Sequence, residues 1–184
     1  SNSMNYLTHP LQFVFSMICF SGFGQSGIVS ITYDDKITYF NCATHEDTVL
    51  LDLTLSLGDV IVTNFDGASD PYNNRYFFGA GCDSLSGYRI FTYDLLSGAL
   101  TASDVFSSFE ELYYDPFENG ILFRDSNNLK RYSLDNSSIT TIGTFPNKMA
   151  GYYGNQHQAY DFVHQQLFYN YLDETESFHY MLFD

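Results

Sequence analysis

The sequence has no tryptophan and very little positive charge. Among its 184 residues, 7 lysines and arginines stand against 22 acidic side chains, which gives a formal net charge of −15. Non-specific binding to nucleic acid or to an anionic bilayer needs clustered lysine and arginine. The charge balance therefore excludes nucleic acid as a general partner. The longest apolar stretch, residues 11–20, is also too short to span a membrane as a helix.

Residues that build helix surfaces are scarce, since the chain has only 6 glutamates beside 16 aspartates. In contrast, it carries 18 phenylalanines and 16 tyrosines, which suit the pleated, half-buried surface of a sheet. Aspartate, asparagine, serine and glycine are abundant, and these residues favour turns. The composition predicts an all-β protein with many turns.

The first 27 residues are predicted to stand apart from the folded domain. Ser1-Asn2-Ser3 before Met4 resembles the remnant of an expression tag, and residues 11–20 have the length of a signal-peptide core. The alternative is that residues 11–20 form a buried strand, because no lysine or arginine precedes them. The signal interpretation predicts a secreted, periplasmic or cell-surface protein.

The three cysteines cannot all pair within one chain. If Cys19 is removed with a signal, Cys42 and Cys82 form a candidate disulfide in an exported protein. The alternative is that the thiols stay reduced and act as small buried hydrophobic groups. No Cys-x-x-Cys spacing is present, which excludes a thiolate zinc site.

Internal repetition is the most informative feature of the chain. Asp70, Asp115 and Asp161 open three similar segments, 45 and 46 residues apart. In each segment the aspartate leads a short polar stretch, and then come two runs in which apolar residues alternate with polar ones, as in half-buried strands. The repeats are predicted near 70–114, 115–160 and 161–184, within one domain over 28–184.

The hairpins YRIFTYDLLSGALTAS (residues 88–103) and LKRYSLDNSSITTIGTF (residues 129–145) resemble the middle hairpin of β-propeller blades. The resemblance covers residues 70–184 and implies antiparallel four-stranded units of about 45 residues. Residues 28–66 would supply a fourth, irregular unit, with strands at 28–33, 36–41, 48–57 and 60–64. At this length the propeller could be incomplete and close with a partner or as a homo-oligomer. The alternative architecture is an open β-sandwich.

Large side chains at equivalent places in the repeats are expected to be buried between sheets. The residues concerned are Phe78, Phe91, Phe123, Tyr132, Phe168 and Tyr180.

A second resemblance concerns residues 50–59, LLDLTLSLGD, which are similar to the phrase LLYDFSLxVGDTI of secreted Bacteroidetes proteins. This chain has Leu51 where an aromatic residue is usual, and Val60 in place of a threonine. The resemblance implies export and says nothing of an activity.

Two loops carry candidate ligand-binding residues. Asp66, Asp70 and Asn73 gather oxygen atoms that would suit calcium, although aspartate and asparagine are also ordinary turn residues. No other cofactor is predicted. Adjacent aromatic and polar side chains suggest a glycan-binding loop at Tyr152, Tyr153, Asn155 and His157.

The sequence contains no Gly-x-Ser-x-Gly motif and no cysteine with a histidine placed to activate it. We therefore predict no catalytic residue and interpret the chain as an exported non-catalytic binding or scaffolding module, with a glycan or a protein as its ligand. Two alternatives stay open: a structural subunit that completes a larger β assembly, and a glycan-active propeller enzyme.

Overall fold

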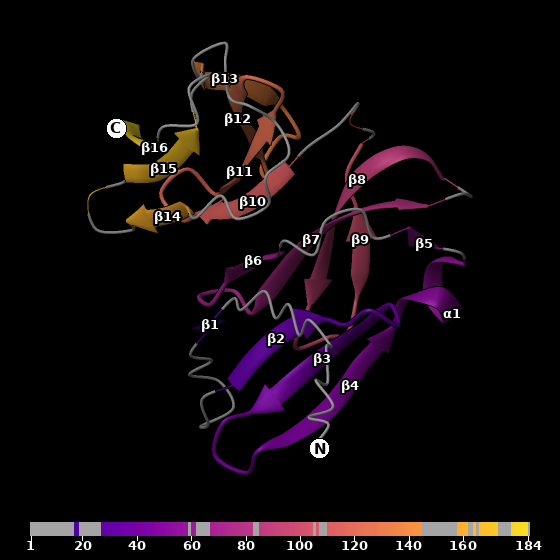
Figure 1. Cartoon of the computed structure of the whole chain (residues 1–184). Coiled ribbons are helices and arrows are strands. Elements are labelled where there is room, and N and C mark those ends of the chain that lie inside the picture. Colours follow the sequence, from indigo (N-terminus) through magenta and orange to yellow (C-terminus); the bar gives the residue numbers. More distant parts are fainter. Residues whose placement is uncertain are drawn as a thin grey trace, which may run out of the picture.

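The computed structural model describes residues 17–18, 27–58, 60–61, 67–82, 85–104, 106, 110–144, 158–161, 164, 166–172 and 178–183. It describes the backbone alone for 17–18, 60–61, 82, 85–86, 110, 158–160, 169–172, 178–181 and 183. The described residues form four antiparallel sheets that follow one another along the chain (Figure 1). We name these sheets A, B, C and D in chain order. The all-β prediction is confirmed.

The bounds of the elements of sheets A and B are as follows. Sheet A contains β1 (Met17–Ile18), β2 (Gly27–Ile31), β3 (Lys36–Asn41) and β4 (Glu46–Asp52), in that order. It is followed by the short helix α1 (Leu53–Leu57). In sheet B, β5 (Val60–Ile61) and β6 (Gly67–Asp70) both pair with β7 (Arg75–Cys82), which pairs with β8 (Leu85–Asp94), and β8 pairs with β9 (Leu100–Ala102).

Sheets C and D repeat this meander. Sheet C contains β10 (Glu110–Asp115), β11 (Gly120–Asp125), β12 (Asn128–Ser133) and β13 (Ile139–Thr144). Sheet D contains β14 (Gln158–Asp161), β15 (Gln166–Leu172) and β16 (Phe178–Phe183). Within the described residues, α1 has only five residues, and no helix is long and apolar enough to cross a membrane.

The recurring aspartates form the same tight turn in three sheets. The Oδ1 atom of Asp70 accepts hydrogen bonds from the backbone N–H groups two and three residues later, at 3.0 and 3.2 Å. Asp115 accepts the corresponding pair at 3.1 and 3.4 Å, and Asp161 accepts from the third residue at 3.1 Å. An aspartate that bonds the backbone just ahead of it stabilises such a turn. Their predicted role as turn formers is confirmed.

The next connection also repeats, which places the sheets in a common register. The carbonyl oxygens of Asp35, Asn74 and Asn119 each accept a hydrogen bond from the residue that directly follows β4, β8 and β12, respectively. All three acceptors have a positive φ, at 55°, 54° and 41°. Asparagine and aspartate tolerate this left-handed conformation better than other residues with a β-carbon.

This register defines two faces for every sheet, because successive residues of a strand point to opposite sides. In sheets A, B and C the turn ends at Asp35, Asn74 and Asn119, respectively. We call the side of the sheet that carries the second residue after this turn the first face. The opposite side, which carries the third residue after the turn, is the second face. The first-face positions are Ile37, Tyr76, Ile121 and Leu167, and the second-face positions are Thr38, Phe77, Leu122 and Phe168.

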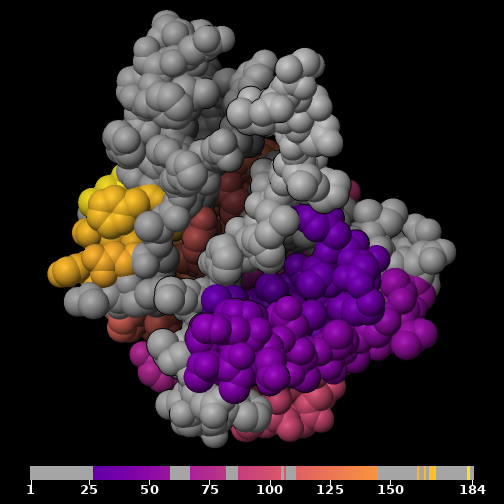
Figure 2. All heavy atoms as spheres, turned by 60° about the horizontal axis from the view of Figure 1, so that its bottom comes forward, coloured from indigo at the N-terminus to yellow at the C-terminus, as the bar shows by residue number. Residues whose placement is uncertain are grey.

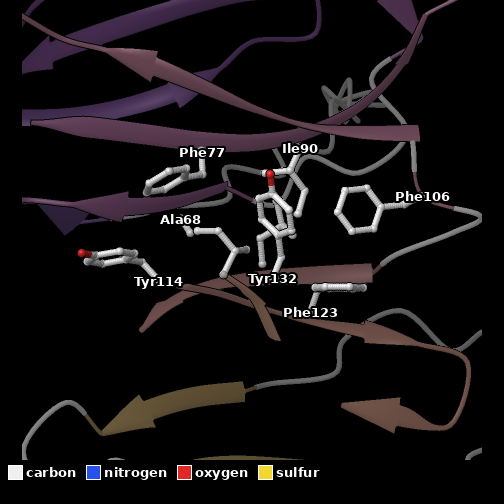
Figure 3. Close-up of a cluster of buried hydrophobic side chains, with 9 residues drawn as sticks. Ala68, Phe77, Ile90, Phe106, Tyr114, Phe123 and Tyr132 are labelled. Atoms are coloured by element: carbon white, nitrogen blue, oxygen red, sulfur yellow. The ribbon is translucent and has the colours of Figure 1, made fainter. Parts of the chain in front are cut away.

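Sheets B and C pack through unlike faces. The second face of sheet B, with Phe77 and Ile90, is buried against the first face of sheet C, with Ile121, Phe123 and Tyr132 (Figure 3). Phe106, which follows β9, closes this core edge-on to Phe123 at 5.3 Å between ring centroids. Strand β6 of sheet B lies next to strand β10 of sheet C.

Sheets A and B pack differently, through like faces. The first face of sheet A, with Val29 and Ile37, meets the first face of sheet B, with Tyr76, Phe78 and Phe91. Phe78 and Phe91 stack with ring centroids 5.2 Å apart and an interplanar angle of 12°. The first face of sheet A therefore points back toward the rest of the chain (Figure 1).

Most of the predicted interior positions are confirmed, and one is wrong. Phe78, Phe91, Phe123 and Tyr132 are buried. Phe168 is 47% exposed, because it lies on the second face of the last sheet, on which no sheet of the described residues packs. The side chain of Tyr180 lies outside the described residues.

The prediction of one strand over residues 48–57 is wrong in its second half. The chain leaves β4 at Asp52, whose Oδ1 atom accepts hydrogen bonds from the Leu55 N–H and the Thr54 hydroxyl. This N-cap starts α1 and turns Leu53 into the core. The alternation of apolar residues in this segment favours a strand, but the Asp52 cap stabilises a helix there instead.

In the N-terminal segment the structure describes only Met17 and Ile18, which form β1 and pair with β2. These two residues lie inside the apolar stretch 11–20. The tag-like residues and the rest of the signal-like segment lie outside the described residues.

Candidate functional site

A cavity with a volume of about 380 Å³ lies between sheets B and C. One wall comes from β8, β9 and the turn between them, and the other comes from β12 and the residue after it. Arg75, at the start of β7, also lines the cavity. The lining residues are Arg75, Ile90, Thr92, Asp94, Ser97, Ala99, Thr101, Ala102, Ser103, Tyr132 and Leu134.

The lining combines hydroxyl groups with one cation and one carboxylate. Thr92 and Thr101 are cross-strand partners on β8 and β9, so their side chains lie on the same side of sheet B. The Oδ1 atom of Asp94 accepts from the backbone of Leu96 and Ser97 at 3.0 and 2.7 Å. These hydrogen bonds, with those from Ser97 first, hold the pKa of Asp94 below its usual value, so the cavity carries a carboxylate at neutral pH.

Arg75 is held in place by residues of both sheets. Its Nε and Nη2 atoms donate to Oδ2 of Asp70, at 2.9 and 2.5 Å, and Nη2 also donates to Oδ1 of Asn119 at 2.9 Å. The guanidinium lies over the rings of Phe77 and Tyr114, with its central carbon 5.5 and 5.8 Å from their centroids. The cation is therefore fixed at the border of the two sheets, where cation–π contacts and hydrogen bonds act together.

The ionisation of Asp70 follows from these contacts. Burial opposes the charged form, but the hydrogen bonds from Asn73 and Arg75 outweigh it, and the pKa of Asp70 is lowered. Burial, followed by the nearby charge of Asp70, raises the pKa of the Tyr114 hydroxyl. At neutral pH the centre of the B–C interface thus holds an ionised Asp70–Arg75 pair beside a neutral tyrosine.

In sheet C the buried turn aspartate also pairs with an arginine, but this arginine comes from a different strand. The buried carboxylate of Asp115 pairs with Arg131, whose Nη2 atom lies 3.1 Å from Oδ2. Gly120 occupies the position of Arg75, and a β-carbon there would lie 2.9 Å from Cγ of Arg131. The absence of a side chain at Gly120 therefore lets Arg131 cross the neighbouring strand and reach the turn.

The predicted calcium ligands are not brought together as a free oxygen cluster. Asp70 has no exposed surface, and its carboxylate is already bonded to Arg75 and Asn73. Asp66 lies outside the described residues. Among the residues that the structure describes, no group of three or more histidine, cysteine, aspartate or glutamate side chains could hold a metal ion.

The predicted glycan-binding loop, Tyr152, Tyr153, Asn155 and His157, lies outside the described residues. Cys42 carries a free thiol in the connection between β3 and β4. The Cys82 side chain also lies outside the described residues, so the disulfide stays a prediction.

Sequence reasoning missed Arg75 as a site residue. The chain has only four arginines, and two of them pair with the recurring turn aspartates. The available signal in the sequence was this scarcity of cations together with the regular spacing of Asp70, Asp115 and Asp161. This signal could not indicate the cavity, because the two walls of the cavity come from different repeats of the sequence.

Comparisons with known proteins give a likeness of fold alone. No protein-family model and no curated protein matches the sequence. TolB from Acinetobacter baumannii superposes with a TM-score of 0.62 at 15% identity, over 87% of this chain and 38% of TolB. The calcium-binding protein regucalcin from Agrobacterium tumefaciens gives 0.56 at 18% identity, over 96% of this chain and 62% of regucalcin.

Nidogen, from a nidogen/laminin complex, gives a TM-score of 0.55 at 14% identity, over 84% of this chain and 59% of nidogen. The chain thus spans between about two fifths and three fifths of the length of these structures. From its sheets and these neighbours, we conclude that the chain has a β-propeller-like fold.

Proposed function

We propose that this chain is an exported, non-catalytic binding module whose ligand enters the cavity between sheets B and C. The observation that carries the proposal is the composition of that cavity. Its volume of about 380 Å³ falls in the range of small-molecule sites. Hydroxyl groups, a fixed guanidinium and a carboxylate together match the donors and acceptors of a saccharide unit or of a polar protein loop.

The fold is compatible with such a role, since nidogen was solved in complex with laminin and regucalcin is described as calcium-binding. The same fold also occurs in an oligogalacturonate lyase, so the fold alone does not choose between binding and catalysis. Export is supported by the signal-like segment and by the phrase at residues 50–59.

The test is a binding screen with a variant that fills the cavity. The full chain is presented to an array of neutral and acidic oligosaccharides, and any binder is then measured by isothermal titration. Thr101 is exposed and lines the cavity, so Thr101→Trp should weaken binding at least tenfold. Thr141→Trp is the matched control, because Thr141 is an exposed strand residue on β13 away from the cavity.

Equal binding by the wild type and by Thr101→Trp would place the ligand elsewhere on the molecule. Chemical conversion of the bound saccharide by the wild type would contradict the non-catalytic part of the proposal.

A further inference from the structure

Sheet D exposes two large apolar side chains that face the same way. Phe168 on β15 and Leu182 on β16 are cross-strand partners, and each has 47% of its surface exposed. Their neighbour Leu167 points to the other side of the sheet and is 2% exposed. Among the described side chains of sheet D, Leu167 is buried on the first face, and Phe168 and Leu182 are exposed on the second.

The position of Phe168 is buried in the two preceding repeats. Counted from the turn aspartate, it corresponds to Phe77 in sheet B and to Leu122 in sheet C. Phe77 has no exposed surface and Leu122 has 2%. Phe77 is covered by the first face of sheet C, and sheet D lies on the far side of sheet C from sheet B (Figure 3).

The second face of sheet B is thus the surface on which sheet C packs, and the equivalent position on the second face of sheet C is buried as well. From this continuity we propose that the second face of sheet D, marked by Phe168 and Leu182, is a docking surface for one further antiparallel β-sheet carried by a partner protein. The partner sheet should present an apolar face like the first face of sheet C, where Leu112, Tyr114, Ile121 and Phe123 are buried.

A second copy of this chain does not offer such a face. The first faces of sheets A and B cover each other, and the first face of sheet C is covered by sheet B. Leu167 on the first face of sheet D is buried as well. If two copies met through their identical second faces of sheet D, the charge of −15 on each copy would oppose that contact.

The test supplies a further sheet, taken from the protein's own sequence. Phe183 lies opposite Leu167 as Tyr93 lies opposite Tyr76. A second copy of residues 95–144 fused after Asp184 therefore continues the repeat in register and adds another sheet C. The control fusion has serine in place of Leu112, Tyr114, Ile121 and Phe123 of the added copy only.

Access to the docking surface is read by alkylation of a cysteine at position 182. In the Leu182→Cys variant, the rate of reaction with a maleimide is followed by mass spectrometry on the peptide that contains position 182, so the native cysteines do not interfere. Ile139→Cys in the original sheet C is the matched reference, because Ile139 has the same 47% exposure on the outer strand β13.

We expect the fusion to slow alkylation at position 182 at least tenfold and to leave position 139 unchanged, while the serine control reacts at the rate of the unextended chain. Equal slowing in both fusions would show that a tether alone hinders access and would overturn the proposal. No slowing would overturn it as well, including the case in which hydrogen exchange shows the added copy to be unfolded, since sheet D should provide its folding surface.

In the unextended chain, protection of position 182 that rises with protein concentration would assign the surface to a second copy and would equally overturn the proposal. Loss of ligand binding in the cavity between sheets B and C has no bearing on these rates, so the proposed function and this inference fail separately.

Discussion

The A–B and B–C interfaces both bury several aromatic side chains, yet their sheets pack through different combinations of faces. At the B–C interface a second face meets a first face, and the first strands β6 and β10 lie next to each other. At the A–B interface two first faces meet. The helix α1, which follows sheet A, also contacts β5 of sheet B.

The difference shows that repetition of the strands does not by itself fix the packing of the sheets. Sheets A and B share the backbone hydrogen bond after the turn and the register of the following strands. Sheet B packs against a neighbouring sheet on each of its two faces. Phe77 on β7 faces sheet C, while Tyr76 and Phe78 on the same strand face sheet A.

The largest effect is expected from removing a ring at either interface. Phe78→Ala and Phe123→Ala each delete a buried ring, and each should lower the free energy of unfolding by about 3–5 kcal/mol. Denaturant titration measures this loss. Native-state hydrogen exchange should show that Phe78→Ala loosens sheet A and that Phe123→Ala loosens sheet C. The same pattern in both variants would mean that the two interfaces are not independent.

Removing the ion pair at the B–C border should have the next largest effect. Asp70→Asn leaves the Arg75 guanidinium without its carboxylate and weakens the turn, so we expect a loss of about 2–4 kcal/mol. Chemical denaturation at pH 7 measures it. Asp34→Asn is the control, because the Asp34–Lys36 pair is exposed and its loss should leave the unfolding midpoint unchanged.

The effect of Asp70 should depend on pH in a definite direction. Because the pKa of Asp70 is lower in the folded state than in the unfolded chain, the ionised carboxylate stabilises the fold above the unfolded value of about 3.9. This contribution is lost as the pH falls below 3.9 and through the folded pKa. The difference in stability between the wild type and Asp70→Asn should therefore shrink below about pH 4. A constant difference from pH 7 to pH 2 would contradict the assignment.

A smaller effect should follow from a methyl group at Gly120. The added β-carbon would lie 2.9 Å from Cγ of Arg131 and 3.0 Å from the Tyr132 carbonyl oxygen, so we expect a loss of about 1–3 kcal/mol. Gly81→Ala is the control, since its nearest contact is an ordinary 3.4 Å. Thermal melts compare the two. If both variants melt like the wild type, the path of Arg131 over Gly120 does not restrict this position.

The smallest effect concerns one hydrogen bond across the A–B interface. The Tyr93 hydroxyl donates to the Leu50 carbonyl oxygen at 3.3 Å, and Tyr93→Phe should cost about 0.5–1.5 kcal/mol. Tyr132→Phe removes a hydroxyl that contacts Ser137 within sheet C, also at 3.3 Å. Faster amide exchange in β4 for Tyr93→Phe alone would confirm that this bond links the sheets. Equal exchange in both variants would contradict the link.

The turns were predictable from the sequence because their causes are local. Asp70, Asp115 and Asp161 bond to backbone groups two or three residues away, and such short contacts leave a pattern in the chain. Alternation also predicted which residues share a side of a strand, as the buried Phe78 and Phe123 confirm.

Alternation does not tell which sheet covers a given side, and this is why Phe168 was predicted to be buried and is exposed. For the same reason, the sequence did not indicate that Arg75 belongs to the cavity between sheets B and C. Arg75 meets Asn119 and Tyr114, about 40 residues later in the chain, and no local spacing indicates that contact. The segment 53–57 shows the reverse case, in which the single local cap at Asp52 overrides an apolar alternation.

The like-face packing of sheet A has a consequence for self-association. A row of sheets joined through unlike faces can in principle grow into a filament, because each end is complementary to the other. Here the first face that would receive the next molecule is already turned inward. On the second face of sheet A, Ser30 and Thr38 form a hydrogen-bonded polar pair at 3.3 Å, and Thr38 is buried. Head-to-tail polymerisation through the unlike-face contact is thus blocked at sheet A.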